Sequence, residues 1–303
     1  MEFSENLFSR LTKEDKDDLS IPEKFKMEYT RLPASMCKDS RYSIALKNGC
    51  LNRYPDILPY DSTRVILPPI PEGCEYSSSE GFIPLQKNPD TYINASNVKV
   101  DDINSIILTQ GPKPETVDTF WWMIFSKRSC VIGMFTKPFE QEKCKSTTYW
   151  PKTQGQVLYV LGGKLKITNI LTEYFDDKSK DVDKMVIVDL LLEFTLGNEI
   201  ISHKVKHFHY KKWPDHGVPE TVSSELLFFL DYLRTYKEET NTTPFVLHCS
   251  AGCGRAGVIC AAFRMLITKE TLFETVFAIR QDRPNLVQSA GQYYYIFRLV
   301  NKK

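Results

Sequence analysis

Residues 246–258 read Val-Leu-His-Cys-Ser-Ala-Gly-Cys-Gly-Arg-Ala-Gly-Val, and they say more about the fold than any other stretch. The apolar residues 245–247 predict a buried strand, and the apolar run over 258–267 predicts a core helix. Gly252 and Gly254 permit a tight turn between the two. The sequence therefore predicts a strand, a glycine-rich turn and a helix in direct succession.

A strand, a glycine turn and a helix start together form a site for an anion. Successive N–H groups of the turn point inward and the helix N-terminus adds its positive end, so main chain alone can hold a tetrahedral dianion. Arg255, six residues after Cys249, can grip two phosphate oxygens at once. The same positive potential favours the thiolate of Cys249 over its thiol. A thiolate beneath a bound phosphate is a nucleophile.

Two other interpretations of this stretch fit less well. Cys249 and Cys253 can be metal ligands, but their spacing differs from that of the usual zinc-binding cysteine pair. The five histidines also offer no second pair of metal ligands with a matching spacing. A glycine-rich turn can also bind a nucleotide, but the Gly-Lys-Ser/Thr and Gly-x-Gly-x-x-Gly patterns are both absent. We therefore expect neither a metal nor a cofactor.

Residues 248–255 resemble the signature of the classical, tyrosine-specific and cysteine-based protein tyrosine phosphatases of the non-receptor type. Further motifs of that family follow in the expected order: Asn52-Arg53-Tyr54, Leu58-Pro59-Tyr60-Asp61, Tyr92-Ile93-Asn94-Ala95-Ser96, Thr109-Gln110-Gly111-Pro112, Tyr149-Trp150-Pro151, His207-Phe208-His209-Tyr210, Trp213-Pro214-Asp215-His216-Gly217-Val218-Pro219, and Val287-Gln288 with Gln292. The resemblance implies an α/β (α+β) fold, in which helices flank a central twisted mixed β-sheet. Because the motifs run from end to end, we expect one domain over 1–303, with a helical N-terminal cap over 1–35.

Composition limits the partners and the location that we expect. Lys and Arg number 39 against 38 Asp and Glu, and this balance argues against a nucleic acid partner. No apolar run is long enough for a membrane span, and the N-terminus lacks the features of a signal peptide. The spacing of the eight cysteines does not match a disulfide framework. This is typical of a protein that keeps free thiols in a reducing compartment. We expect a cytoplasmic monomer without membrane insertion, whose partners, by resemblance, are phosphotyrosine-containing proteins.

Hydrophobic spacing predicts the remaining elements. It predicts helices over 116–127, 223–239 and 292–300, a buried strand over 130–135, and strands of a meander over 157–172 and 184–195 around a charged turn at 176–183. A weak helical pattern through Leu7, Leu11, Phe25 and Tyr29 supports the N-terminal cap. The turn-rich residues 36–90 predict loop with short strands.

A cysteinyl-phosphate mechanism needs an acid, because a phenolate leaving group with a pKa of about 10 departs slowly near neutral pH. By resemblance Asp215 is that acid. Pro214 and Gly217 beside it mark a loop that can move, with Trp213 as its hinge or anchor. In a second step the ionised carboxylate can take a proton from attacking water.

The resemblance also assigns residues that handle water and substrate. Gln288 and Gln292 match the pair that positions water, although a surface glutamine beside a helix start is an alternative for Gln292. Tyr54 matches the aromatic wall that stacks on the substrate ring, and Asp56 the acid that holds substrate N–H groups. Phosphate binding is expected from the loop residues Ser250, Ala251, Gly252, Cys253, Gly254 and Arg255.

Six further residues are expected to support the site or to brace its loop. Glu140 matches the glutamate that orients the signature arginine, and Lys145 a lysine near the acid loop, although either can instead be a solvated charge. His248 is expected to tune the thiolate through hydrogen bonds, and Trp213 to anchor the acid loop. Asn94 and Arg283 are expected to brace the loop.

The largest departure from the family pattern is Ala256. The family normally has serine or threonine there, and its hydroxyl donates to the cysteine sulfur when the phosphoenzyme is hydrolysed. Loss of one such donor costs on the order of a hundredfold in rate, or somewhat less. The sequence therefore predicts that Cys249 is phosphorylated normally but that the intermediate breaks down slowly.

The sequence leaves two functions to compare. One is hydrolysis of phosphotyrosine in proteins, and the other is a catalytically weakened module that captures phosphotyrosine. A pure binder has no need for Cys249, Arg255 and Asp215, so their presence favours catalysis. A phosphatase of lipid phosphates would be expected to carry lysines in the loop, where this chain has Ser250, Ala251 and Cys253.

Overall fold

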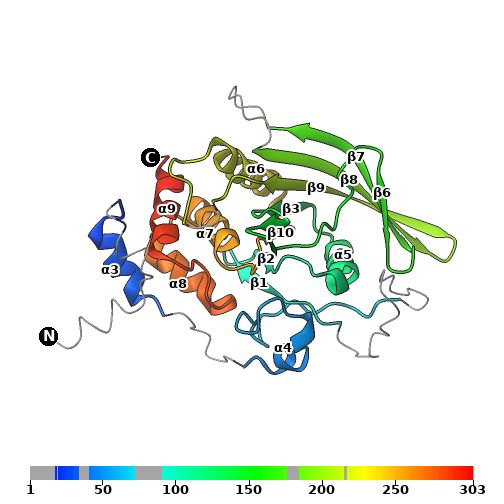
Figure 1. Cartoon of the computed structure of the whole chain (residues 1–303), viewed down its shortest axis with the longest axis horizontal. Coiled ribbons are helices and arrows are strands. Elements are labelled where there is room, and N and C mark those ends of the chain that lie inside the picture. Colours follow the sequence, from blue (N-terminus) through cyan, green and yellow to red (C-terminus); the bar gives the residue numbers. More distant parts are fainter. Residues whose placement is uncertain are drawn as a thin grey trace.

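A mixed eight-stranded sheet forms the centre of the fold, with strand order β1-β2-β10-β3-β9-β8-β7-β6 (Figure 1). The computed structural model describes residue 18 and residues 20–33, 41–71, 91–175, 184–214 and 217–302. The strands are β1 (Ala95–Lys99), β2 (Ser105–Thr109), β3 (Val131–Met134), β6 (Val157–Val160), β7 (Leu165–Tyr174), β8 (Met185–Leu196), β9 (Glu199–Tyr210) and β10 (Phe245–His248). A separate small hairpin pairs β4 (Phe139–Glu140) with β5 (Lys143–Cys144).

The direction of the strands decides where a site can form. The central strands β2, β10, β3 and β9 run parallel to one another, whereas β1 and the meander β6 to β8 pair antiparallel. Parallel strands end at the same edge of a sheet, and ligands of such sheets bind beyond their carboxyl ends. Gln110, Cys249, Phe135 and Trp213 all lie just beyond these ends. The topology therefore brings four segments that are distant in sequence to one edge.

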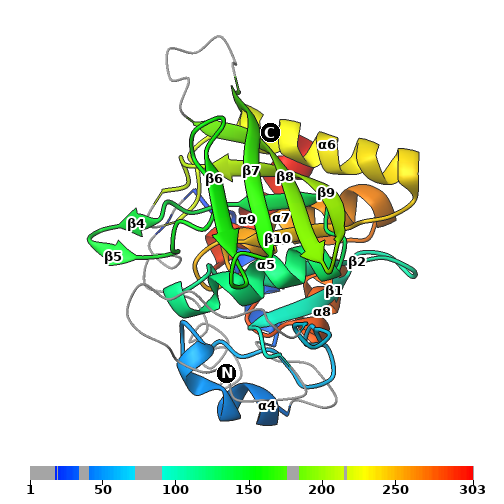
Figure 2. The same ribbon diagram turned by 90° about the vertical axis from the view of Figure 1, so that its right-hand side faces the viewer.

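Helices cover both faces of the sheet (Figures 1 and 2). On one face lie α6 (Ser224–Thr240), α7 (Arg255–Thr268), α8 (Leu272–Asp282) and α9 (Ala290–Asn301), with α3 (Glu23–Arg31) packed outside α9. On the other face lies α5 (Val117–Ser126). The short elements are α4 (Ser43–Lys47), η1 (Gly49–Leu51) and η2 (Pro114–Thr116). None of the described helices is both long and apolar enough to cross a membrane.

Each face of the sheet has its own hydrophobic core. Val131 belongs to the core under α6 to α9, and its neighbour Ile132 belongs to the core under α5. Successive side chains of a strand point to opposite faces, so a strand buried on both sides reads as a continuous apolar run. This explains why the run over 130–135 predicts β3 correctly.

Most of the predicted elements are confirmed. The fold class is the mixed α/β (α+β) arrangement expected, and α5, α6, α9, β3 and the β10-turn-α7 unit lie where the sequence predicts them. Ser223 caps α6 by accepting a hydrogen bond from the Leu226 N–H. Phe25 and Tyr29 of the expected cap are buried residues of α3. Leu7 and Leu11 lie outside the described residues, as does the turn predicted at 176–183.

Two expectations about secondary structure are wrong, and two elements were missed. The single strand over 157–172 is two strands, because Leu161, Gly162 and Gly163 take positive φ angles and turn the chain back. Strand β9 and helix α8 were not expected as elements. Within 41–71 the chain forms α4 and η1 instead of short strands, and the described part of this region contributes only isolated bridges, such as that of Arg64 with Ser96.

Candidate active site

Cys249 begins a loop between β10 and α7 that we call the cysteine loop, residues 249–255. The carbonyl groups of residues 249–254 all accept hydrogen bonds from flanking groups: His248 Nδ1 to Cys249, the Gly111 N–H to Ser250, the Arg283 guanidinium to Ala251 and Gly252, the Val287 N–H to Cys253, and the Val258 N–H to Gly254. In a trans peptide the N–H points opposite to the preceding carbonyl. The N–H groups of residues 250–255 therefore face away from these partners.

Gly252 makes this loop geometry possible. Its φ is +72°, and a Cβ on this residue would clash with the carbonyl oxygen of Thr109. Only glycine avoids both the unfavourable φ and the clash. Arg283, which is fully buried, braces the same turn and also donates to Asn94 Oδ1 at 2.9 Å. Asn94 and Arg283 thus brace the loop as expected.

Arg255 is oriented by a buried carboxylate. Its Nη1 lies 2.6 Å from Glu140 Oε1, and its Nη2 lies 2.9 Å from Glu140 Oε2. Thr136 Oγ1 donates to the same carboxylate at 2.9 Å. Burial raises the pKa of Glu140, but the hydrogen bonds and the charge of Arg255 outweigh burial and hold the pKa below its ordinary value. Glu140 is therefore the partner of Arg255 and not a solvated charge.

Tyr54 is joined to the cysteine loop through a hydroxyl group. Ser250 Oγ donates to the Lys145 carbonyl at 2.9 Å, so its single proton is used there. The Tyr54 hydroxyl, 2.8 Å from Ser250 Oγ, must then be the donor of the second bond. Arg53 fixes this segment by donating to the carbonyls of Gly111, Pro112 and Cys144, a contribution that sequence reasoning missed although Arg53 lies inside a quoted motif.

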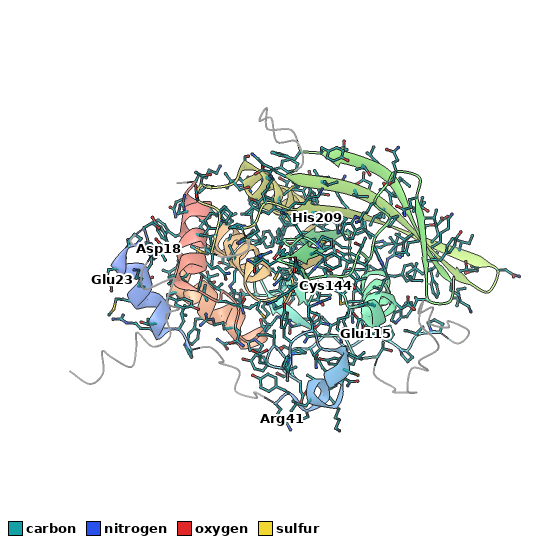
Figure 3. The ribbon with its side chains drawn as sticks, in the orientation of Figure 1. Asp18, Glu23, Arg41, Glu115, Cys144 and His209 are labelled. Atoms are coloured by element: carbon teal, nitrogen blue, oxygen red, sulfur yellow. The ribbon has the colours of Figure 1, made fainter. Side chains whose placement is uncertain are left out.

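A cleft of about 1090 Å³ opens above the cysteine loop. Most of the expected site residues line it: Tyr54, Asp56, Glu140, Lys145, Cys249, Ser250, Ala251, Gly254, Arg255, Gln288 and Gln292. Cys249 itself is only 5% exposed. The cleft also extends along α9 to Tyr294, Arg298 and Asp18, which Figure 3 shows beside α9. No sequence motif predicts this extension, because contacts between distant segments create it.

Five expected residues lie behind the wall of the cleft, namely His248, Gly252, Cys253, Ala256 and Trp213. The thiol of Cys253 is buried and donates to the Pro284 carbonyl at 3.5 Å, and burial raises its pKa. The side chain of Cys253 therefore does not face the cleft.

Asp215 and His216 lie outside the described residues. On either side of them, the Trp213 indole N–H donates to the Gly217 carbonyl at 3.3 Å, and Arg255 Nη2 donates to the Pro214 carbonyl at 3.3 Å. The Trp213 ring also packs edge-on against Tyr295 of α9. The flanks of the expected acid loop are thus fixed beside Arg255.

A buried chain of hydrogen bonds leads away from His248. Its Nδ1 must carry a proton, because it donates to the Cys249 carbonyl at 3.0 Å. Its Nε2 then accepts from the Tyr149 hydroxyl at 2.6 Å, and His207 Nε2 donates to that hydroxyl at 2.9 Å. Burial lowers the pKa of His248 to about 4 and that of His207 well below its ordinary value. Both rings are therefore neutral at neutral pH, and His248 contacts the backbone of Cys249.

The glutamine pair meets the cysteine loop at Gly254. Gln292 Oε1 accepts from the Gln288 N–H at 2.9 Å. A Cβ on Gly254 would lie 2.7 Å from Gln288 Oε1 and 3.0 Å from Gln292 Nε2. Both amides therefore face the start of α7 from within the cleft, and Gln292 is not a detached surface residue.

Comparisons with known proteins agree with this geometry. The family model described as protein-tyrosine phosphatase matches residues 48–302. Tyrosine-protein phosphatase non-receptor type 20 of Rattus norvegicus is 31% identical over 94% of this chain, which spans 61% of that protein's length. Tyrosine-protein phosphatase 3 of Schizosaccharomyces pombe is 34% identical over 80% of this chain and 70% of that protein.

A solved structure from a study of PTPN18 and HER2 tyrosine phosphorylation sites covers 86% of both chains, with a TM-score of 0.69 and 29% identity. The likeness therefore extends from sequence motifs to the arrangement of the sheet and helices. The chain belongs to the protein-tyrosine phosphatase family.

Proposed function

We propose that this chain hydrolyses phosphotyrosine in protein substrates through a phosphocysteine intermediate on Cys249. The observation that carries the proposal is the cysteine loop, in which the carbonyls of residues 249–254 are all bonded to flanking groups. The N–H groups of residues 250–255 point away from those groups, and we infer that they bind an anion held at Cys249. Arg255, whose Nη1 and Nη2 are both bonded to Glu140, adds a positive charge beside the same position. A phosphate dianion fits this set of donors.

In the first step the Cys249 thiolate attacks phosphorus. A sulfur–phosphorus bond forms, and the bond from phosphorus to the tyrosine oxygen breaks with its electron pair leaving on that oxygen. Asp215 supplies the proton that the oxygen needs. The loop N–H groups and Arg255 bind the charge that spreads over the other phosphate oxygens.

In the second step water attacks the phosphocysteine. The sulfur–phosphorus bond breaks, the thiolate is restored, and the carboxylate of Asp215 takes the proton from water. Gln288 and Gln292, whose amides face the start of α7 in the cleft, orient the water. A neutral amide suits this task because it binds water without competing as a nucleophile.

Selectivity for tyrosine follows from access to Cys249. The residue is 5% exposed on the floor of the cleft, and Tyr54 forms part of the wall above it. A long aromatic side chain reaches this depth and stacks on Tyr54, whereas phosphoserine is too short.

Ala256 is proposed to slow the second step. It is fully buried in the first turn of α7, next to Arg255, and it brings no hydroxyl to stabilise the departing thiolate. The same substitution supports the alternative function, a module that captures phosphotyrosine and releases it slowly.

Stopped-flow turnover of p-nitrophenyl phosphate separates the two functions, with Cys249→Ser as the blank. We expect a burst of p-nitrophenol equal to the enzyme concentration, then a slow steady rate that Ala256→Ser raises by about a hundredfold or somewhat less. A phosphotyrosine peptide should be hydrolysed and its phosphoserine counterpart should not. Binding of the peptide without any phosphate release would favour the capture module. A steady rate without a burst that Ala256→Ser leaves unchanged would remove the role of Ala256.

A further inference from the structure

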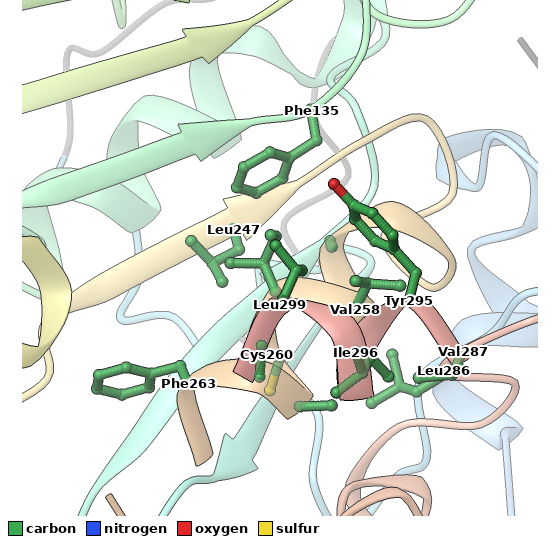
Figure 4. Close-up of a cluster of buried hydrophobic side chains, with 14 of the residues drawn as sticks. Phe135, Leu247, Val258, Cys260, Phe263, Leu286, Val287, Tyr295, Ile296 and Leu299 are labelled. Carbon is green, nitrogen blue, oxygen red and sulfur yellow. The ribbon is translucent and has the colours of Figure 1, made fainter. Parts of the chain in front are cut away.

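Val287 is held in an unusual backbone conformation directly before Gln288. Its φ is +61°, in the left-handed region that β-branched residues rarely enter. Such a conformation costs free energy and persists only where the surroundings enforce it. Val287 is fully buried beside Leu286 and α9 (Figure 4). Its contacts must therefore impose this conformation.

Hydrogen bonds hold both peptide groups of Val287. Its N–H donates to the Cys253 carbonyl of the cysteine loop at 3.1 Å. Its carbonyl accepts from Arg280 Nη2 at 2.7 Å and from the Tyr29 hydroxyl at 3.2 Å. Val287 thus joins the cysteine loop to α8 and to the N-terminal helix α3.

Arg280 is fixed by the same N-terminal segment. It is buried, and its Nη1 donates to the carbonyls of Leu32 and Pro33 at 3.2 and 2.9 Å. Its guanidinium also lies 5.4 Å from the centre of the Tyr29 ring. Both donors to the Val287 carbonyl are therefore placed by α3 and the residues that follow it.

One rigid peptide group transmits this placement to the glutamine pair. The Val287 carbonyl and the Gln288 N–H belong to the same planar peptide. Tyr29 and Arg280 hold its oxygen, and its N–H donates to Gln292 Oε1 at 2.9 Å. A rotation of this peptide would move the Gln288 side chain and break the bond to Gln292 together.

We propose that Tyr29 and Arg280 form a carbonyl clamp that positions Gln288 and Gln292 for hydrolysis of the phosphocysteine. Helix α3 thereby sets the rate of the second chemical step, and the proposal rests on the function proposed above. Neither clamp residue lines the cleft, so both are positioning residues that act through the Val287 peptide.

The test measures the two chemical steps separately in the full chain. The burst of p-nitrophenol in stopped flow gives the rate of phosphorylation, and acid-quenched samples of ³²P-labelled phosphoenzyme give the rate of its breakdown. Tyr29→Phe removes one hydroxyl. We expect it to slow breakdown about fivefold, the order of effect of one positioning hydrogen bond, and to leave the burst rate unchanged.

Tyr293→Phe is the matched control. It removes the hydroxyl that bonds Glu28 at 2.9 Å, so it loosens a different contact of α3, with α9, and keeps both donors to the Val287 carbonyl. We expect wild-type rates for both steps from this variant. If Tyr29→Phe slows both steps equally, or matches Tyr293→Phe, the clamp is only structural and the proposal is overturned. If the wild-type chain forms no phosphoenzyme, the proposed function itself fails, which is a different result.

Discussion

Glu140 and Arg255 form a two-point ion pair, with Nη1–Oε1 and Nη2–Oε2 distances of 2.6 and 2.9 Å. Glu140→Gln keeps the shape of the side chain but presents an N–H₂ group to a guanidinium that has no acceptor. We expect kcat/KM for an aryl phosphate to fall by about tenfold to a hundredfold, because Arg255 loses its orientation. Glu142→Gln, on an exposed residue of the same hairpin, is the control and should match the wild type in steady-state kinetics. Equal losses in both variants would contradict the role of the ion pair.

Gly252 should tolerate no side chain. Gly252→Ala adds a Cβ at a φ of +72° and against the Thr109 carbonyl, so the cysteine loop must shift. We expect kcat to fall by about a hundredfold or more and the free energy of unfolding to fall by about 2 kcal/mol. Gly49→Ala is the matched control, because a Cβ at Gly49 meets nothing within 4 Å. Urea unfolding and turnover of p-nitrophenyl phosphate measure the two effects, and a fully active Gly252→Ala would refute this account of the loop.

Tyr54 should act mainly through its ring. Tyr54→Phe removes only the hydrogen bond to Ser250, and we expect a change in KM of about threefold or less for a phosphotyrosine peptide. Tyr54→Ala also removes the wall that stacks on the substrate, so KM should rise by about tenfold or more. Steady-state kinetics of both variants provide the comparison. Similar KM values for Phe and Ala at this position would mean that the hydroxyl, and not the ring, is what matters.

The sequence predicts contiguous features well and distant contacts poorly. The cysteine loop is predictable because its strand, turn and helix are consecutive, so local backbone preferences decide its shape. The pairing of Glu140 with Arg255 spans 115 residues, and only the resemblance to a family suggested it. The hydrogen bond from Tyr29 to the Val287 carbonyl spans 258 residues, and no local sequence pattern predicts it.

Strand β9 shows a different limit. Its sequence carries His203, His207 and His209, and hydrophobic spacing treats these as polar positions. In the fold all three are buried, with their Nε2 atoms bonded to the Ser129 carbonyl, the Tyr149 hydroxyl and the Thr136 carbonyl. Buried histidines whose Nε2 atoms are bonded can lie in the core, but the partners become known only from the structure.

The buried histidines should make the fold sensitive to acid. Burial lowers the pKa of His248 from 6.5 to about 4. Between these pH values the unfolded chain binds a proton at this position and the folded chain does not, so stability rises with pH across this window and is fully present above about 6.5. Each such group contributes a slope of about 1.4 kcal/mol per pH unit. We expect the free energy of unfolding to fall steeply from pH 6.5 toward pH 4.

His248→Asn isolates this contribution in urea unfolding at several pH values. Asparagine keeps an N–H₂ group near the Cys249 carbonyl but does not titrate, so the slope between pH 6 and 5 should be shallower than that of the wild type by about 1 kcal/mol per pH unit. His207 also has a lowered pKa and remains in the variant, so part of the acid sensitivity should persist. Equal slopes for the two proteins would mean that His248 is protonated in the folded chain. In that case His248 Nε2 would donate to the Tyr149 hydroxyl instead of accepting from it.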